Sequence, residues 1–68
     1  MISDRNIWMS AKLMVDQHGA EASFETAGKA DELLAKGDLE GQRTWLRILR
    51  AVEWLQDERG RDPFKVAH

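Results

Sequence analysis

The tripeptide Lys36-Gly37-Asp38 constrains the fold of this chain more than any other feature of its sequence. A cation favours the last turn of a helix, and glycine readily takes the left-handed conformation that ends one. Aspartate caps the first turn of a following helix. The tripeptide therefore predicts one helix that ends at about Lys36 and another that begins at about Leu39.

Hydrophobic spacing predicts the length of the second of these helices. Apolar residues recur at steps of three and four from Leu39 to Arg59, and Gly60 is expected to end the helix. Gly41 is expected to leave room for a neighbouring backbone or a bulky ring. The apolar stripe consists of Trp45, Ile48, Leu49, Val52 and Leu55.

The segment from Ala20 to Lys36 combines small and charged residues. Its small residues share one helical face, which lets another helix approach closely, and Leu33 and Leu34 lie at the end of that face. This segment therefore predicts a helix packed through small side chains. The small residues are Ala22, Ser23, Ala27 and Ala30.

The first helix is expected from about Asp4 to His18, with Ser3 or Asp4 as its cap and Gly19 as its stop. A helix that runs through Gly19 would lose only about 1 kcal/mol relative to alanine, so a long first helix is the alternative. The sequence therefore predicts an all-α fold, either a small three-helix bundle or a long helical hairpin. We expect one helical domain over residues 1–60 and a C-terminal tail over residues 61–68.

Length and composition narrow the class of protein. Sixty-eight residues lie near the lower limit for a single hydrophobic core. The absence of cysteine excludes disulfides and thiol catalysis. The first residues lack a secretory signal pattern, and no apolar run is long enough to span a membrane. We therefore expect a cytoplasmic protein without a membrane segment.

A spaced pattern in the second half of the chain carries a family resemblance. Residues 30–33 read Ala-Asp-Glu-Leu and residues 37–41 read Gly-Asp-Leu-Glu-Gly, followed by Trp45, Ile48 and Ala51-Val52. This arrangement resembles a family of small, functionally uncharacterised alphaproteobacterial proteins, a domain of unknown function, over roughly residues 4 to 56. The resemblance implies a bacterial, cytoplasmic, helical protein, and it implies no chemistry.

No spacing of residues in the chain predicts catalysis. The glycines do not form a phosphate-binding loop, and neither a nucleophile motif nor a metal-binding motif is present. We therefore expect a protein that is not an enzyme, with no catalytic, cofactor-binding or metal-binding residues. Asp31 is predicted to be a buried structural carboxylate with a hydrogen-bond partner, because it falls at the edge of the small-residue face. His18 is predicted to be a half-buried histidine at a helix end.

Apolar residues outside the expected core predict a protein partner. Trp54 falls away from the stripe of its helix, and Met9 and Leu13 fall opposite the stripe of the first helix. A small domain with so much apolar surface is expected to self-associate, and symmetric homodimers are the commonest soluble assembly. The predicted partner-binding residues are Met9, Leu13, Leu46 and Trp54.

A row of arginines offers an alternative function. Arg43, Arg47 and Arg50 share one face of the last helix and could contact the phosphates of a nucleic acid. The net charge of −2 and the acidic residue Asp57 weigh against a continuous basic surface. Nucleic-acid binding is therefore the second hypothesis, after self-association.

Overall fold

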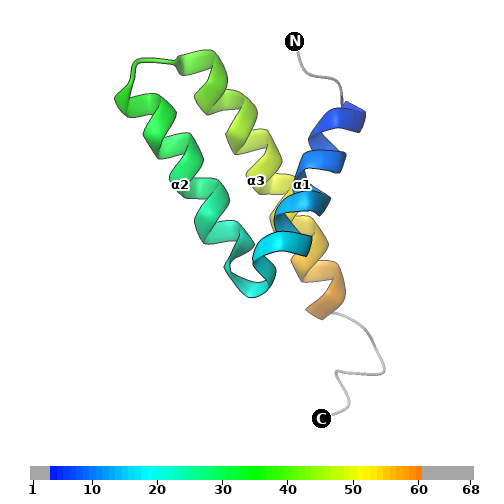
Figure 1. Ribbon diagram of the computed structural model, residues 1–68. Coiled ribbons are helices and arrows are strands. Elements are labelled where there is room, and N and C mark those ends of the chain that lie inside the picture. Colours follow the sequence, from blue (N-terminus) through cyan, green and yellow to red (C-terminus); the bar gives the residue numbers. More distant parts are fainter. Residues whose placement is uncertain (1–3, 61–68) are drawn as a thin grey trace.

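The computed structural model describes residues 4–60, and the side chains of residues 4–57. It contains α1 (Asp4–His18), a single turn of 3-10 helix, η1 (Gly19–Glu21), α2 (Ala22–Ala35) and α3 (Leu39–Gly60), and this part of the chain holds no strand. The predicted all-α class is confirmed. Helices α2 and α3 lie antiparallel, and α1 crosses the C-terminal half of α3 (Figure 1). The predicted tail, residues 61–68, lies outside the described residues.

Backbone hydrogen bonds close the turn between α2 and α3 as the sequence predicts. Gly37 has a φ of +81°, and its N–H donates to the Leu34 carbonyl at 3.0 Å. The N–H of Asp38 donates to the Leu33 carbonyl at 2.9 Å, which completes a Schellman motif. The Asp38 carboxylate then accepts a 2.9 Å hydrogen bond from the N–H of Gly41 and caps α3.

Gly41 does not serve the purpose that the sequence suggested. A Cβ atom at this position would collide with the carboxylate of Asp38. The predicted role, room for a neighbouring backbone or ring, is therefore wrong. The glycine leaves space for the capping side chain of its own helix.

The boundary between α1 and α2 falls at Gly19. Its φ of +57° is left-handed, so α1 ends there. The 3-10 turn η1 then leads directly into α2 without a loop. The chain is therefore helical almost continuously from Asp4 to Ala35 but bends at the predicted glycine, and the unbroken first helix of the alternative is not formed.

The core consists largely of small and medium side chains where the three helices meet. Helix α2 contributes Ala22, Thr26 and Ala30, none of which is larger than threonine. Small residues bring the helix axes close together but bury little apolar area each. Many of the large hydrophobic residues therefore remain outside the core. The buried residues of the other helices are Ile7, Ala11, Met14 and Val15 in α1 and Ile48, Ala51 and Val52 in α3, with Trp45 and Leu55 packed against them.

None of the described helices has an apolar stretch long enough to cross a lipid bilayer.

Candidate interaction surfaces

Eight large hydrophobic side chains in the described part of the chain are exposed. They include all four predicted partner-binding residues, with exposed fractions of 59% for Met9, 54% for Leu13, 38% for Leu46 and 54% for Trp54. Exposed apolar residues that gather into patches are typical of interaction sites. The other four are Trp8, Phe24, Leu34 and Leu39.

A groove between α1 and α3 forms the first surface. The ring centroids of Trp8 and Trp54 lie 5.4 Å apart at an interplanar angle of 79°, an edge-to-face contact. The groove has a volume of about 340 Å³, and Ile7 and Ala51 are its buried lining residues. Trp54 therefore helps to hold α1 against α3, a packing role that the sequence did not predict.

Two residues of the arginine row, Arg47 and Arg50, line this groove, and Arg50 also borders the outer surface of α3. Arg47 donates to the Asp4 carboxylate at 2.8 Å, so one of the three arginines joins α3 to the first turn of α1. Arg43 and Arg50 are exposed. Because the Asp4 and Arg47 side chains are themselves 85% and 45% exposed, water screens their attraction.

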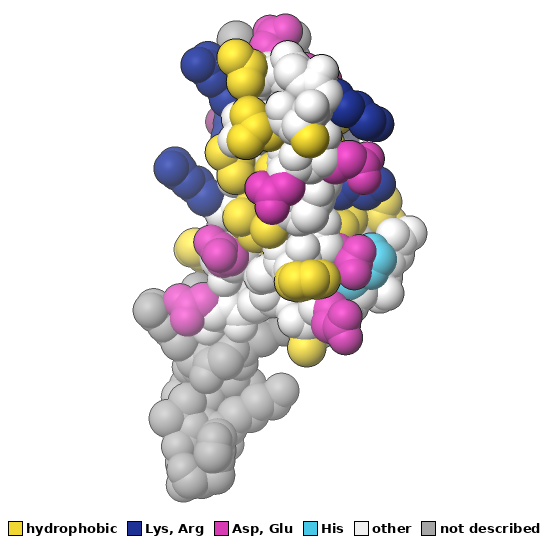
Figure 2. All heavy atoms as spheres, turned by 90° about the vertical axis from the view of Figure 1, so that its left-hand side faces the viewer, with side chains coloured by type: hydrophobic (Ala, Val, Ile, Leu, Met, Phe, Trp, Pro, Cys, Tyr) yellow, Lys and Arg dark blue, Asp and Glu magenta, His cyan; other side chains and the backbone are white. Residues whose placement is uncertain are grey.

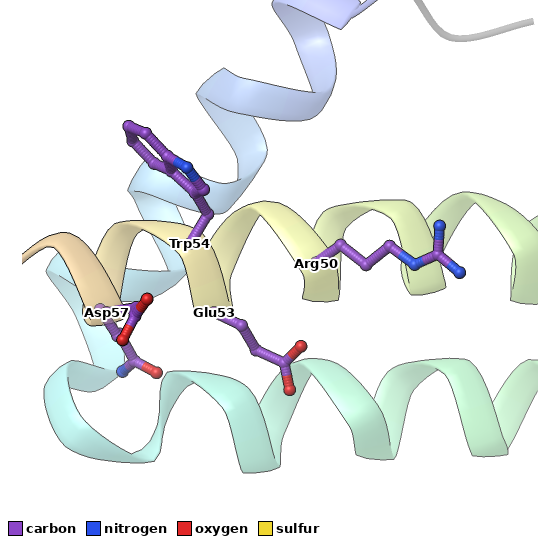
Figure 3. A pocket seen from close by; sticks show the side chains of 5 residues that line it. Arg50, Glu53, Trp54 and Asp57 are labelled. Carbon is purple, nitrogen blue, oxygen red and sulfur yellow. The ribbon is translucent and has the colours of Figure 1, made fainter.

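A shallow depression on the outer surface of α3 adjoins the groove. Figure 3 shows Trp54 leaving α3 toward α1, Glu53 leaving it toward α2, and Arg50 extending along α3 toward its N-terminal half. The outer surface of this helix therefore presents both charge signs beside an aromatic ring.

The side of the α2–α3 hairpin that α1 does not cover forms the second surface. Helix α1 packs against the side of α3 that carries Ile48 and Ala51, and helical geometry places Leu46 and Leu49 on the other side. On α2, Ala22 belongs to the core cluster with the residues of α1, and helical geometry places Ala27 and Leu34 about 120–140° from Ala22, on the uncovered side. We call these four residues, Ala27, Leu34, Leu46 and Leu49, the open hairpin face.

Figure 2 views the molecule from the side of α2. Hydrophobic side chains form a column in the upper part of the view, with lysine or arginine side chains beyond it on one edge. On the other edge, charged side chains of both signs and a histidine are interspersed. The apolar surface of the hairpin is therefore gathered on one side.

Met9 and Leu13 belong to a third surface. Both lie on the side of α1 turned away from α3, because Ile7 and Ala11 face the core. Leu46 points away from α1 on the far side of α3. The structure therefore does not bring the four predicted residues together in one patch.

Two sequence predictions about polar residues are wrong. Asp31 is exposed, because the rotation of about 100° from the buried Ala30 carries it past the edge of the narrow small-residue face. His18 is also exposed, at the outer end of α1. Water can solvate both side chains, so neither needs an internal partner.

Among the described residues, the buried polar side chain is Thr26, which the sequence did not predict to be buried. It is fully buried, and its Oγ1 has no hydrogen-bond partner among the described residues. Its spacing offered a signal, because Thr26 lies four residues from both Ala22 and Ala30 at the centre of the small-residue face.

Within the described residues, no three histidine or acidic side chains lie close enough together to hold a metal ion. Comparisons with models of protein families, with curated proteins and with solved structures found no match to this chain. The resemblance to an alphaproteobacterial family therefore stays a prediction.

Proposed function

We propose that this protein is a non-enzymatic helical interaction module that self-associates, and that the open hairpin face is its contact surface. The observation that carries the proposal is the exposure of Leu34 and Leu46, 48% and 38%, on the side of the hairpin that α1 leaves uncovered. The proposal retains Leu46 from the predicted partner-binding set and joins it to residues of α2.

The composition of the open hairpin face supports close packing against another helical surface. Ala27 has little side-chain volume, so a neighbouring helix can approach the backbone of α2 there. Leu49 is half-buried, so this face already adjoins packed side chains. Covering this face would extend the existing core rather than create a separate one.

The two other apolar surfaces support self-association less well. The tryptophans of the groove already contact each other, and Arg47 beside them pairs with Asp4. Met9 and Leu13 lie beside the charged pair Lys12 and Asp16, whose side chains are 3.3 Å apart. These charged residues already pair within one copy, so they lose water when the surface is covered and gain no new partner, which opposes association.

Sedimentation equilibrium over the micromolar range tests the proposal. We expect a reversible dimer whose population increases with protein concentration. Leu46→Asp should abolish the dimer, because it places a charge in the open hairpin face. The matched control Leu13→Asp, which adds the same charge on the outer side of α1, should leave it intact.

Two results would overturn the proposal. A strictly monomeric wild-type protein would remove self-association. A dimer that Leu13→Asp dissociates and Leu46→Asp does not would move the contact surface to α1.

A further inference from the structure

We infer that the second copy binds through a two-fold axis parallel to α2 and α3, so that Asp31 of each copy pairs with Arg50 of the other. This inference rests on the proposed self-association through the open hairpin face and specifies its geometry. It begins from residues of both helices that the fold of one copy leaves exposed and unpaired.

Each helix of the hairpin presents one row of residues at helical spacing. On α2 the row is Ala27, Asp31 and Leu34, and on α3 it is Leu46, Arg50 and Glu53. Steps of four and three residues keep each row on one face of its helix. Each row has a leucine at the end nearest the α2–α3 turn and a charged residue in the middle, acidic in α2 and basic in α3.

Contacts at the two ends of the hairpin set the relative levels of the rows. The Ser23 hydroxyl donates to the Gln56 side chain at 2.6 Å at one end, and the Gly37 turn closes the other end. Between these fixed points, Asp31 lies level with the part of α3 between Arg43 and Ile48, and Arg50 lies just beyond that part. Figure 3 shows the Arg50 side chain extending along α3 toward that level.

A two-fold axis parallel to the helices preserves these levels and exchanges the helices. Helix α2 of one copy then lies over α3 of the other, and Leu34 meets Leu46 of the partner subunit. Asp31 likewise meets the partner's Arg50. Each contact occurs twice, because the interface of a two-fold dimer is the same on both copies.

The charges favour a second copy in this orientation over other arrangements. Asp31 and Arg50 are both exposed, and neither makes an ion pair within the described residues. A two-fold axis perpendicular to the helices would instead lay α2 on α2 and α3 on α3. That arrangement separates Asp31 from the partner's Arg50, because the two residues lie on different helices, and it loses both ion pairs.

Two charge-reversal variants test the arrangement. Asp31→Arg gives a copy with arginine at both positions, and Arg50→Asp gives a copy with aspartate at both. Each variant alone should dimerise at least about tenfold more weakly than the wild type, because every cross-copy pair becomes repulsive. An equal mixture should form the heterodimer, in which both pairs again have opposite charges.

Native mass spectrometry of the mixture separates the heterodimer from the two homodimers by mass. Lys29→Asp is the matched control, because Lys29 is exposed on α2 outside the row. Mixed with Asp31→Arg, it should produce no preferred heterodimer. Circular dichroism of each variant verifies that the helices remain folded.

The outcomes separate this inference from the proposed function. A wild-type dimer that Leu46→Asp dissociates, with a mixture that shows no preference for the heterodimer, would overturn the two-fold arrangement and leave the open hairpin face as the contact surface. A wild-type monomer would overturn both. Preferential heterodimer formation by the two reversed variants is the result expected.

Discussion

The side-chain amide of Gln56 donates a 2.8 Å hydrogen bond to the backbone carbonyl of Gly19, across the bend between α1 and α2. The oxygen of the same amide accepts the hydroxyl of Ser23 at 2.6 Å. One side chain of α3 thus joins the 3-10 turn η1 to the first turn of α2. It fixes the place where the chain changes direction.

Replacing this side chain should loosen the bend. We expect Gln56→Ala to lower the free energy of unfolding by about 1–2 kcal/mol, because two hydrogen bonds are lost near the surface. Urea unfolding followed by circular dichroism measures the change. Gln42→Ala, also half-buried on α3, is the control and should cost less than about 0.5 kcal/mol. Equal losses in the two variants would show that the bend does not depend on Gln56.

Replacement by alanine is expected to change the stability of the protein in opposite directions at two glycines. Gly19 has a φ of +57°, so Gly19→Ala should destabilise the protein by about 1 kcal/mol. Gly28 lies within α2, is exposed and has open space at its Cβ position, so Gly28→Ala should stabilise by about 0.5–1 kcal/mol. Thermal unfolding of both variants gives the signs, and two changes of the same sign would contradict this interpretation of the bend.

The buried hydroxyl of Thr26 is expected to lower the free energy of unfolding. Valine has nearly the same shape and no polar group, so Thr26→Val should raise the free energy of unfolding by about 1 kcal/mol. Thr26→Ser, which keeps the hydroxyl and removes a methyl group, should lower it. Chemical denaturation compares the two variants, and a loss of stability in Thr26→Val would mean that the hydroxyl contributes favourably to the fold.

The contact between Trp8 and Trp54 should appear as an energetic coupling. A double-mutant cycle with leucine at each position is expected to give about 0.5–1 kcal/mol, since edge-to-face pairs contribute beyond the area that they bury. A parallel cycle of Trp8 with Trp45, which packs against the core, should give a coupling near zero. Coupling of similar size in the two cycles would argue against a specific ring contact.

The arginine row should not bind DNA strongly. Arg47 pairs with Asp4, and the acidic residues Glu53 and Asp57 follow the row on the exposed side of α3. We therefore expect no measurable affinity for duplex DNA at physiological salt, and only weak binding at low salt. A fluorescence-anisotropy titration across salt concentrations measures this, and tight binding that Arg43→Ala and Arg50→Ala both weaken would revive the nucleic-acid hypothesis.

Local signals predicted most of the fold. The turn at Gly37 depends on one left-handed residue and one capping carboxylate, both of which are visible in adjacent positions. The stripes of α1 and α3 depend on spacing alone. The helix end at Gly19 was also predicted, because it depends on the backbone conformation of that one residue. No capping side chain follows Gly19 to mark the start of the next helix.

The interaction surfaces were harder to predict, because they depend on how the helices are arranged. The helical wheel of α2 places Asp31 near the packing face, but the width of that face is set by the small residues that bring α3 close. Leu46 was predicted together with Met9 and Leu13, since sequence does not give the side of α3 on which α1 lies. Gln56 carried no signal, because its two hydrogen bonds join positions far apart in the chain.

The Gly37 turn also bears on the order of folding. Its capping bonds join residues only a few positions apart, so the α2–α3 hairpin closes with little loss of chain entropy, whereas α1 must dock across α3 through contacts distant in sequence. The open hairpin face lies wholly within that early-forming hairpin. Under the proposed self-association, two chains can therefore meet before α1 has docked, and association and folding would then be kinetically coupled.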